Sequence, residues 1–335
     1  MKRILHVVSI ALLTIVFLAL FLWNSNLHVV WRIIESADFF WLATTLAVNW
    51  FALVLRTFRW RTILDPEHPP PFYPTFFANA IGYMVSTILP VRAADVIRPV
   101  LLSRRTGLRV SGAFGTVLTE RILDLFSLLA LYVYFIIVHW NDWRNEKSFV
   151  IIRSAGIAAA LVMFALIAFM VGLYFFSGFV RRLHEGLGRI LPMRYRASWM
   201  HFFDAFVETL ALAKKPLALL KVLLCTAGIW FCLSAQFWLV TIAMHHRLPF
   251  DSSFFVSGIT TLGLAVPTPG GVGGFHKACQ LVLTTFYDFD VNSSVAVAIV
   301  FHLVGTIPIL VTGLFLFVHE GLRWRDVREI KAVEE

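Results

Sequence analysis

Residues 263–277 read GLAVPTPGGVGGFHK and lie inside an apolar stretch that extends from position 251 to position 287. Proline and glycine at this density end a helix, because proline has no amide hydrogen and glycine loses the most conformational freedom when it is ordered. A second apolar stretch, residues 72–105, is interrupted in the same way around Pro90. Each stretch therefore predicts two short helices separated by a break.

The composition places these breaks in a membrane. Of the 335 residues, 59% are hydrophobic and 15% are charged, against roughly 45–50% and roughly 25% in an average soluble domain. A soluble fold of this length cannot bury so much apolar surface. The composition therefore excludes a soluble enzyme, a disordered chain and a coiled coil. The three cysteines lie in apolar runs, without the spacing of a disulfide framework or a zinc site.

Several apolar runs reach the roughly 20 residues that a spanning helix needs: 4–23, 39–58, 113–138, 152–176, 218–243 and 294–318. Non-helical backbone is tolerated at membrane depth only where it is buried in protein or lines a cavity. The two interrupted stretches are therefore predicted to be re-entrant hairpins, which enter and leave the membrane on one side. The predicted fold class is an all-α polytopic membrane protein with about six spanning helices and two re-entrant broken-helix hairpins.

The net charge is +9, from 29 Lys and Arg against 20 Asp and Glu. The cations cluster in short loops between apolar runs, which is typical of the positive-inside rule and not of a nucleic-acid-binding protein. With the N-terminus inside, few of them fall in the outer loops: Arg32, Arg144, Lys147, Arg153 and Arg247. Both termini, the tail 319–335 and the polar connector 178–217 are predicted to be cytoplasmic, in a bacterial-type plasma (inner) membrane. The connector is expected to form amphipathic helices, either on the lipid surface or packed on the bundle.

The order of elements also repeats. Two spans, a broken hairpin and a third span occur in residues 4–138 and again in residues 152–318. Because each half has an odd number of crossings, the second half is inverted relative to the first, as in many transporters. This inverted repeat predicts that residues near Pro90 approach residues near Gly271. It also predicts one integral membrane domain over residues 1–335, without a separate catalytic domain.

Three charged residues lie inside a predicted span: Glu120, Arg121 and Asp124. Glu120 and Asp124 are four positions apart and share a helix face. Charges are costly within a span and usually face the bundle interior. They form either a structural ion pair that ties this helix to the first hairpin or a polar site inside the bundle. In both cases we expect them to lie near Arg92 or Arg98.

Each hairpin also offers a site for an anion. A half-helix is predicted to begin after each break, and helix N-termini suit phosphate because their amides are free and the helix dipole is positive there. No cofactor or metal is expected. The candidate substrate-binding residues are the polar and break residues of both hairpins together with the charges of the span: Arg92, Asp95, Arg98, Glu120, Arg121, Asp124, Pro269, Gly270, Gly271, Gly273 and Lys277.

Other polar residues are assigned supporting roles. His302 is expected to pack across helices rather than to carry a proton. Arg56, Arg59 and Arg61 end the second predicted span beside Trp60. We expect these arginines to extend to lipid headgroups, with direct contact to the substrate as the alternative. The sequence has no Walker motif, so ATP is not expected to drive the protein directly.

Four segments together resemble the transmembrane domain of lysylphosphatidylglycerol synthases, also called the flippase-like membrane domain: residues 56–61, 82–98, 119–124 and 267–273. The resemblance covers nearly the whole chain. Ala94 and Asp95 stand where the family typically has Gly and Glu, and His276 and Lys277 stand where it often has Glu. The soluble aminoacyl-transfer domain of the family's two-part members is not expected, because the chain ends soon after its last predicted helix.

The resemblance implies that the protein translocates a phospholipid or lipid-linked headgroup between the leaflets of the plasma membrane and is not an enzyme. Membrane lipids are the expected partners, with a lipid-modifying or glycosyl-transfer enzyme as a further one, and no nucleic acid. One alternative is a non-transporting partner of a lipid-modifying enzyme. Another is an intramembrane lipid-headgroup enzyme that uses Glu120 or Asp124 with His302 as acid and base.

Overall fold

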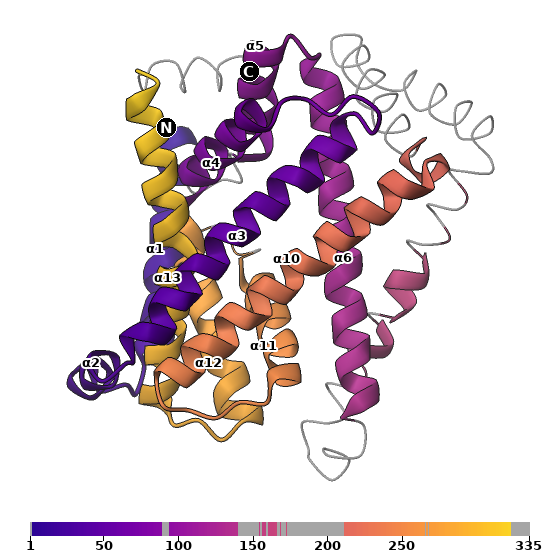
Figure 1. The fold of residues 1–335 in the computed structure, drawn as a ribbon. Coiled ribbons are helices and arrows are strands. Elements are labelled where there is room, and N and C mark those ends of the chain that lie inside the picture. Colours follow the sequence, from indigo (N-terminus) through magenta and orange to yellow (C-terminus); the bar gives the residue numbers. More distant parts are fainter. Residues whose placement is uncertain are drawn as a thin grey trace. The chain divides into compact units, whose positions relative to one another are not determined.

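The computed structural model describes residues 2–88, 94–139, 211–264, 266 and 268–322, together with scattered positions between 154 and 172 (Figure 1). Every regular element within these residues is helical, which confirms the predicted all-α class. The elements whose bounds lie in the described residues are, in chain order, α1 (Lys2–Leu22), α2 (Leu27–Glu35), α3 (Phe39–Leu64), α4 (Phe72–Ile88), α5 (Ala94–Thr106), α6 (Val110–Val138), η1 (Ala211–Lys214), α10 (Pro216–Ala243), α11 (Phe250–Gly263), η2 (Pro269–Gly271), α12 (Gly274–Phe286) and α13 (Val291–His319).

Four of these helices are long and apolar enough to cross a membrane: α3, α6, α10 and α13, with 26 to 29 residues each. They confirm the predicted spans 39–58, 113–138, 218–243 and 294–318. Helix α1 coincides with the predicted span 4–23 as far as Leu22, and it passes the same test only together with α2, as a bent pair. The predicted span 152–176 falls largely outside the described residues, as do most of the connector 178–217 and the tail beyond Leu322.

The chain bends by 79° between α1 and α2, a turn that was not predicted. Asn24 has a φ of 63°, in the left-handed region that asparagine enters more readily than most residues. The Asn26 side chain then accepts hydrogen bonds from the amides of His28 and Val29 and caps α2. These two asparagines end one helix and start the next.

The chain forms two compact units. Unit 1 comprises Met1–Leu55, Asn79–Ile97 and Gly228–Glu335, and unit 2 comprises Arg56–Ala78 and Arg98–Ala227. Each unit takes residues from both predicted halves of the sequence. The two units are described separately below.

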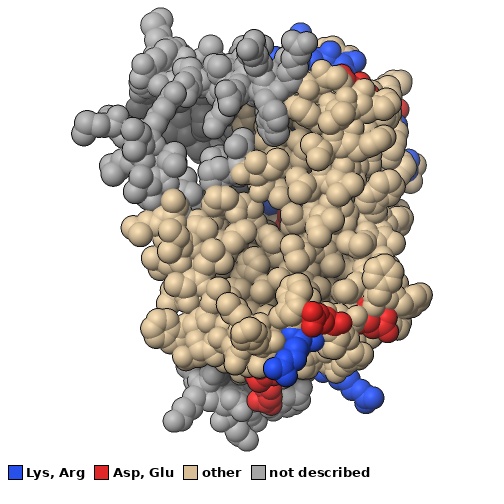
Figure 2. Space-filling model, turned by 90° about the vertical axis from the view of Figure 1, so that its left-hand side faces the viewer, with Lys and Arg blue, Asp and Glu red and all other residues tan. Residues whose placement is uncertain are grey.

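Large hydrophobic side chains are exposed along the long helices, as expected for surfaces that face lipid. Phe51 of α3, Leu224 of α10 and Phe315 of α13 are each more than half exposed. Most of the described surface in Figure 2 carries no Lys, Arg, Asp or Glu. An apolar surface of this extent is unfavourable in water and is typical of a protein embedded in lipid.

In unit 1, α1 ends where α13 begins. The backbone N–H of Asn26 donates to Oδ1 of Asn292 at 2.7 Å, and Asp290 caps the start of α13. The start of α1 and the end of α13 accordingly lie at the same end of unit 1 (Figure 1). Helix α10 ends beside α3, because the N–H of Asp38 donates to the Ala243 carbonyl at 2.8 Å.

A buried amide connects three helices of unit 1. Nδ2 of Asn49, on α3, donates to Oε1 of Gln236 on α10 at 3.1 Å. The same nitrogen lies 3.2 Å from the Val304 carbonyl oxygen and 3.0 Å from the Gly305 carbonyl oxygen, both on α13. An unsatisfied polar group in hydrocarbon costs several kcal/mol, so this amide holds α3, α10 and α13 in one arrangement.

The second interrupted stretch folds back as predicted. Helices α11 and α12 contain 14 and 13 residues, fewer than a span requires. A Cβ placed on Gly263, at the end of α11, would lie 2.6 Å from the carbonyl oxygen of Gly274, at the start of α12. The two backbones therefore touch where the hairpin opens, and only glycine fits there.

The first interrupted stretch also reverses direction. The Ser86 hydroxyl, near the end of α4, accepts a hydrogen bond from the N–H of Ala94, the first residue of α5, at 2.6 Å. Helix α5 therefore begins beside the last turn of α4. Residues 89–93, which include Pro90 and Arg92, lie outside the described residues.

Candidate functional site

Unit 2 contains a group of charged side chains from α3, α5 and α6, which we call the charge cluster: Arg59, Arg98, Glu120, Arg121 and Asp124. Oε2 of Glu120 accepts a hydrogen bond from Nη2 of Arg98 at 2.8 Å, and Oε1 lies 3.3 Å from Nε of Arg59. Nη1 of Arg59 also lies 2.6 Å from Oδ1 of Asp124. The side chains of Arg59, Arg98 and Glu120 are each at most 1% exposed.

Aromatic and hydroxyl groups hold this cluster in place. The guanidinium of Arg98 lies 4.3 Å above the ring of Trp60, a cation–π contact that strengthens when water is excluded. The Trp60 indole N–H donates to the hydroxyl of Thr116 on α6 at 2.9 Å. Trp60 therefore joins α3 to α6 and supports the cation that pairs with Glu120.

The prediction for Glu120 is confirmed, since it is buried and contacts Arg98 of α5. The prediction for Arg59 is wrong, because its side chain does not extend to headgroups but is buried between Glu120 and Asp124. The net negative charge that two acids and one arginine leave in the span is balanced by Arg98, so the burial of Arg59 had no separate signal in the sequence. Arg61 likewise donates to the Pro70 carbonyl, at 2.6 Å.

Asp124 and Arg121 form the edge of the cluster. Their side chains are 22% and 33% exposed, and Nη1 of Arg121 lies 3.7 Å from Oδ2 of Asp124. Asp124 is held more closely by Arg59, which reaches both of its carboxylate oxygens. In the buried part of the cluster each oxygen of Glu120 contacts an arginine, and the accessible part carries one acid and one base.

In unit 1 the tip of the second hairpin contacts the end of α4. Gly270 has a φ of 58°, and a Cβ at this position would lie 2.9 Å from the carbonyl oxygen of Thr87, in the last turn of α4. This contact confirms the predicted approach of the two breaks. Gly273, with a φ of 95°, is similarly close to Phe17 of α1. Both glycines combine a backbone conformation and a close approach that a side chain would prevent.

The other predicted site residues divide between the units. Pro269 and Gly271 lie in η2 at the tip of the second hairpin, beside Gly270. Asp95 is half-buried in the first turn of α5. Arg92 lies outside the described residues. The structure thus brings Arg98 together with Glu120, and it brings the glycines of the second hairpin together with the end of α4.

His302 packs as expected, within an aromatic group of unit 1. Its ring centroid lies 4.6 Å from that of His276 and 5.1 Å from that of Phe275. Nδ1 of His276 accepts a hydrogen bond from the N–H of Gly273 at 3.4 Å. The imidazoles therefore connect the start of α12 to the middle of α13.

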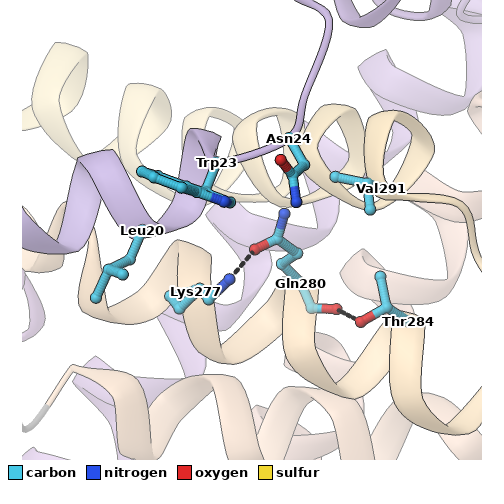
Figure 3. Close-up of a pocket in the computed structure, with 7 residues that line it drawn as sticks. All are labelled: Leu20, Trp23, Asn24, Lys277, Gln280, Thr284 and Val291. Carbon is cyan, nitrogen blue, oxygen red and sulfur yellow. Dashed lines mark hydrogen bonds between the residues drawn. The ribbon is translucent and has the colours of Figure 1, made fainter.

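Lys277 lines a pocket of about 370 Å³ at the end of α1 and beside α12 and the start of α13 (Figure 3). Its ammonium donates to Oε1 of Gln280 at 2.7 Å, and Nε2 of Gln280 donates to the Phe21 carbonyl at 2.9 Å. Gln280 and Asn24 were not predicted as site residues. The contact of Gln280 with Phe21 joins positions 259 residues apart, which spacing in the sequence does not indicate.

The sequence matches one membrane family along most of its length. Residues 6–313 match the family described as the lysylphosphatidylglycerol synthase TM region. The chain belongs to this family. A UPF0104 membrane protein from Methanocaldococcus jannaschii is 23% identical over 234 residues, which are 70% of this chain and 92% of that protein. Membership of the lysylphosphatidylglycerol synthase TM family confirms the predicted resemblance and the multi-pass membrane character of the chain.

Proposed function

We propose that the protein translocates a phospholipid or lipid-linked headgroup between the leaflets of a bacterial-type plasma membrane, without changing it covalently. The observation that carries this proposal is the meeting of the two broken hairpins at Thr87 and Gly270. Transporters commonly place their substrate sites where discontinuous helices meet. Membership of a family named for lipid synthesis supports a lipid as the substrate.

The physical problem in such a reaction is to carry a polar headgroup through roughly 30 Å of hydrocarbon. A continuous helix satisfies all of its own backbone groups and offers none to a substrate. A helix that ends at membrane depth leaves carbonyl or amide groups available, and unit 1 holds two such ends in contact. A headgroup could exchange water for these groups as it passes between leaflets.

The charge cluster has a supporting role in this proposal. Its buried ion pairs fix α3, α5 and α6 around a polar interior, and its accessible edge at Arg121 and Asp124 offers charge to a headgroup. We further propose that both termini are cytoplasmic, as the distribution of cationic residues favours. Membrane lipids are the proposed partners.

Leaflet exchange in liposomes tests the proposal. The purified protein is reconstituted with a trace of fluorescent phospholipid, and a reductant that cannot cross the membrane is added outside. Without exchange, only label in the outer leaflet is bleached. With exchange, label from both leaflets is bleached, and chromatography recovers the lipid unchanged.

Two variants sharpen this test. Gly270→Leu places a side chain against the Thr87 carbonyl and is expected to reduce exchange strongly. Gly258→Ala lies in the same hairpin, where an added Cβ meets nothing within 4 Å, and should exchange lipid like the wild type. A wild-type protein that moves none of the phospholipid or polyprenyl-linked probes faster than empty liposomes would contradict translocation. A new lipid product would instead indicate an enzyme.

A further inference from the structure

The pocket beside Lys277 combines an apolar wall with a polar floor. Leu20, Trp23 and Val291 form the apolar part, and Asn24, Gln280 and Thr284 contribute the amides and the hydroxyl. In Figure 3 the side chain of Asn24 points down toward Gln280, and Lys277, below Trp23, points toward Gln280 from the other side. This mixture fits an amphipathic molecule, with a polar group on α12 and a nonpolar part against the end of α1.

The charge of Lys277 is not neutralised within the described part of the chain. Its ammonium contacts the neutral amide oxygen of Gln280, and no described carboxylate lies within ion-pair distance of it. The lysine also sits in the first turn of α12, where the helix dipole is positive and disfavours a cation. An anion bound in the pocket would neutralise the ammonium and would also interact favourably with the positive end of the helix dipole.

The position of Lys277 along α12 strengthens this argument. At a rise of about 1.5 Å per residue, Lys277 lies about 14 Å along α12 from Phe286, the last residue of the helix. The pocket wall beside it is apolar, with Leu20, Trp23 and Val291 among the lining residues. An ammonium held among apolar helices is costly without a counter-charge, and such cations commonly mark the path of a substrate.

The pocket lining also discriminates between headgroups. Its lining residues include a lysine but no aspartate or glutamate. A phosphodiester finds the Lys277 ammonium, whereas an amine attached to that phosphodiester would find no acid and would lie close to the lysine. Like charges at such a distance disfavour binding.

We infer that this pocket binds the phosphate of a net anionic phospholipid headgroup, with Lys277 as its counter-ion, and selects against headgroups that carry an amine. The inference rests on the proposed function for its assignment to a lipid, and it extends that function by naming the charge of the substrate. Gln280, held by the Phe21 carbonyl, positions the ammonium. The wall formed by Leu20 and Trp23 contacts the glycerol and the first acyl carbons.

Binding is measured apart from transport. The detergent-solubilised full chain is titrated with phosphatidylglycerol or phosphatidylethanolamine, and bound lipid is counted by native mass spectrometry. We expect phosphatidylglycerol to bind about tenfold more tightly or better, because the ammonium of phosphatidylethanolamine would lie close to the Lys277 ammonium, whereas the glycerol headgroup carries no cation. Lys277→Met and Lys277→Gln should lose this preference, and Lys277→Arg should keep it. Lys221→Met removes an exposed cation of α10 and should bind both lipids like the wild type.

Three outcomes overturn the inference. One is a folded Lys277→Met or Lys277→Gln variant that keeps the wild-type preference for phosphatidylglycerol. A second is a wild-type protein that binds both lipids equally. The third is displacement of phosphatidylglycerol by millimolar inorganic phosphate, which would assign the pocket to free phosphate. Lys277-dependent binding in a protein without leaflet exchange supports the pocket and contradicts translocation, so the two proposals fail separately.

Discussion

The guanidinium of Arg98 lies 2.8 Å from the carboxylate of Glu120, and neither side chain is more than 1% exposed. Arg59 contacts the other oxygen of the same carboxylate, so one glutamate joins α3, α5 and α6. A buried ion pair contributes little compared with an apolar substitute, but loss of one partner leaves a buried charge uncompensated. Removal of one partner is therefore predicted to destabilise the protein by much more than the intact pair stabilises it.

Removal of the Glu120 charge should destabilise the protein. Glu120→Gln leaves Arg59 and Arg98 with one carboxylate fewer, and we expect a loss of about 3–5 kcal/mol, measured as thermal unfolding in detergent. The matched control is the exposed pair of Lys215 and Glu67, at 2.9 Å, where Lys215→Met should cost less than about 1 kcal/mol. Equal melting temperatures for the Glu120 variant and the wild type would contradict a structural role for this carboxylate.

Arg121 should behave differently from Glu120. Because its side chain is one-third exposed, Arg121→Ala should retain most of the stability, with a loss of about 1 kcal/mol in the free energy of unfolding. On the proposed function, the same variant should lose leaflet exchange. Melting and exchange are measured on one preparation. A folded Arg121→Ala protein with wild-type exchange would refute the functional assignment of this residue.

The N-cap of α13 gives a pH-dependent prediction. Burial alone would raise the pKa of Asp290, but hydrogen bonds from Ser293 and from the Asn292 amide outweigh it and hold the pKa below its ordinary value of 3.8. The stabilisation from the carboxylate is thus present above the ordinary pKa and is lost as the pH falls through the folded-state value. Asp290→Asn should keep the cap and lose less stability on acidification than the wild type.

Asp290→Ala removes the cap itself. We expect a loss of about 1 kcal/mol near neutral pH, measured as the midpoint of thermal unfolding. Asp290→Asn is the control at that pH and should melt close to the wild type. An alanine variant as stable as the wild type would show that the amides of Asn292 and Ser293 find other partners.

The predicted topology is tested by labelling in intact cells. Cys225, Cys232 and Cys279 are first replaced, and a single cysteine is introduced by Asn145→Cys or Ile190→Cys. A thiol reagent that cannot cross the membrane should label position 145 and leave position 190 unmodified until the cells are opened. The reverse pattern would contradict the cytoplasmic assignment of the termini and the connector.

The sequence allowed the interrupted helices to be predicted because Pro269 and the glycines around it cannot continue a helix. It also allowed the pairing of Glu120 with Arg98, because charge inside an apolar span demands a partner close by. The burial of Arg59 could not be predicted from the sequence by the same argument. An arginine at the end of a span reaches water or a buried acid according to which helix packs beside it, and that neighbour is set by tertiary structure.

The contact of Gln280 with the Phe21 carbonyl was beyond prediction for a similar reason. A glutamine on a short apolar helix is compatible with many partners, and only the packing of α1 against α12 selects one. The bend at Asn24, by contrast, had a local signal. Asparagine adopts a positive φ more readily than most residues and is a preferred N-cap. Asn24 followed by Asn26 therefore indicated a helix boundary in the sequence.

The amide of Asn49 has a consequence for which substitutions the family can accept. Pro308 lies inside α13 and has no N–H, so the carbonyl of Val304, four residues earlier, lacks its partner within the helix. Asn49 supplies that hydrogen from α3. We therefore expect an apolar residue at position 49 to be better tolerated when Pro308 is replaced as well. Without the proline, the N–H of residue 308 could bond the Val304 carbonyl within the helix, and the hydrogen from Asn49 would no longer be needed.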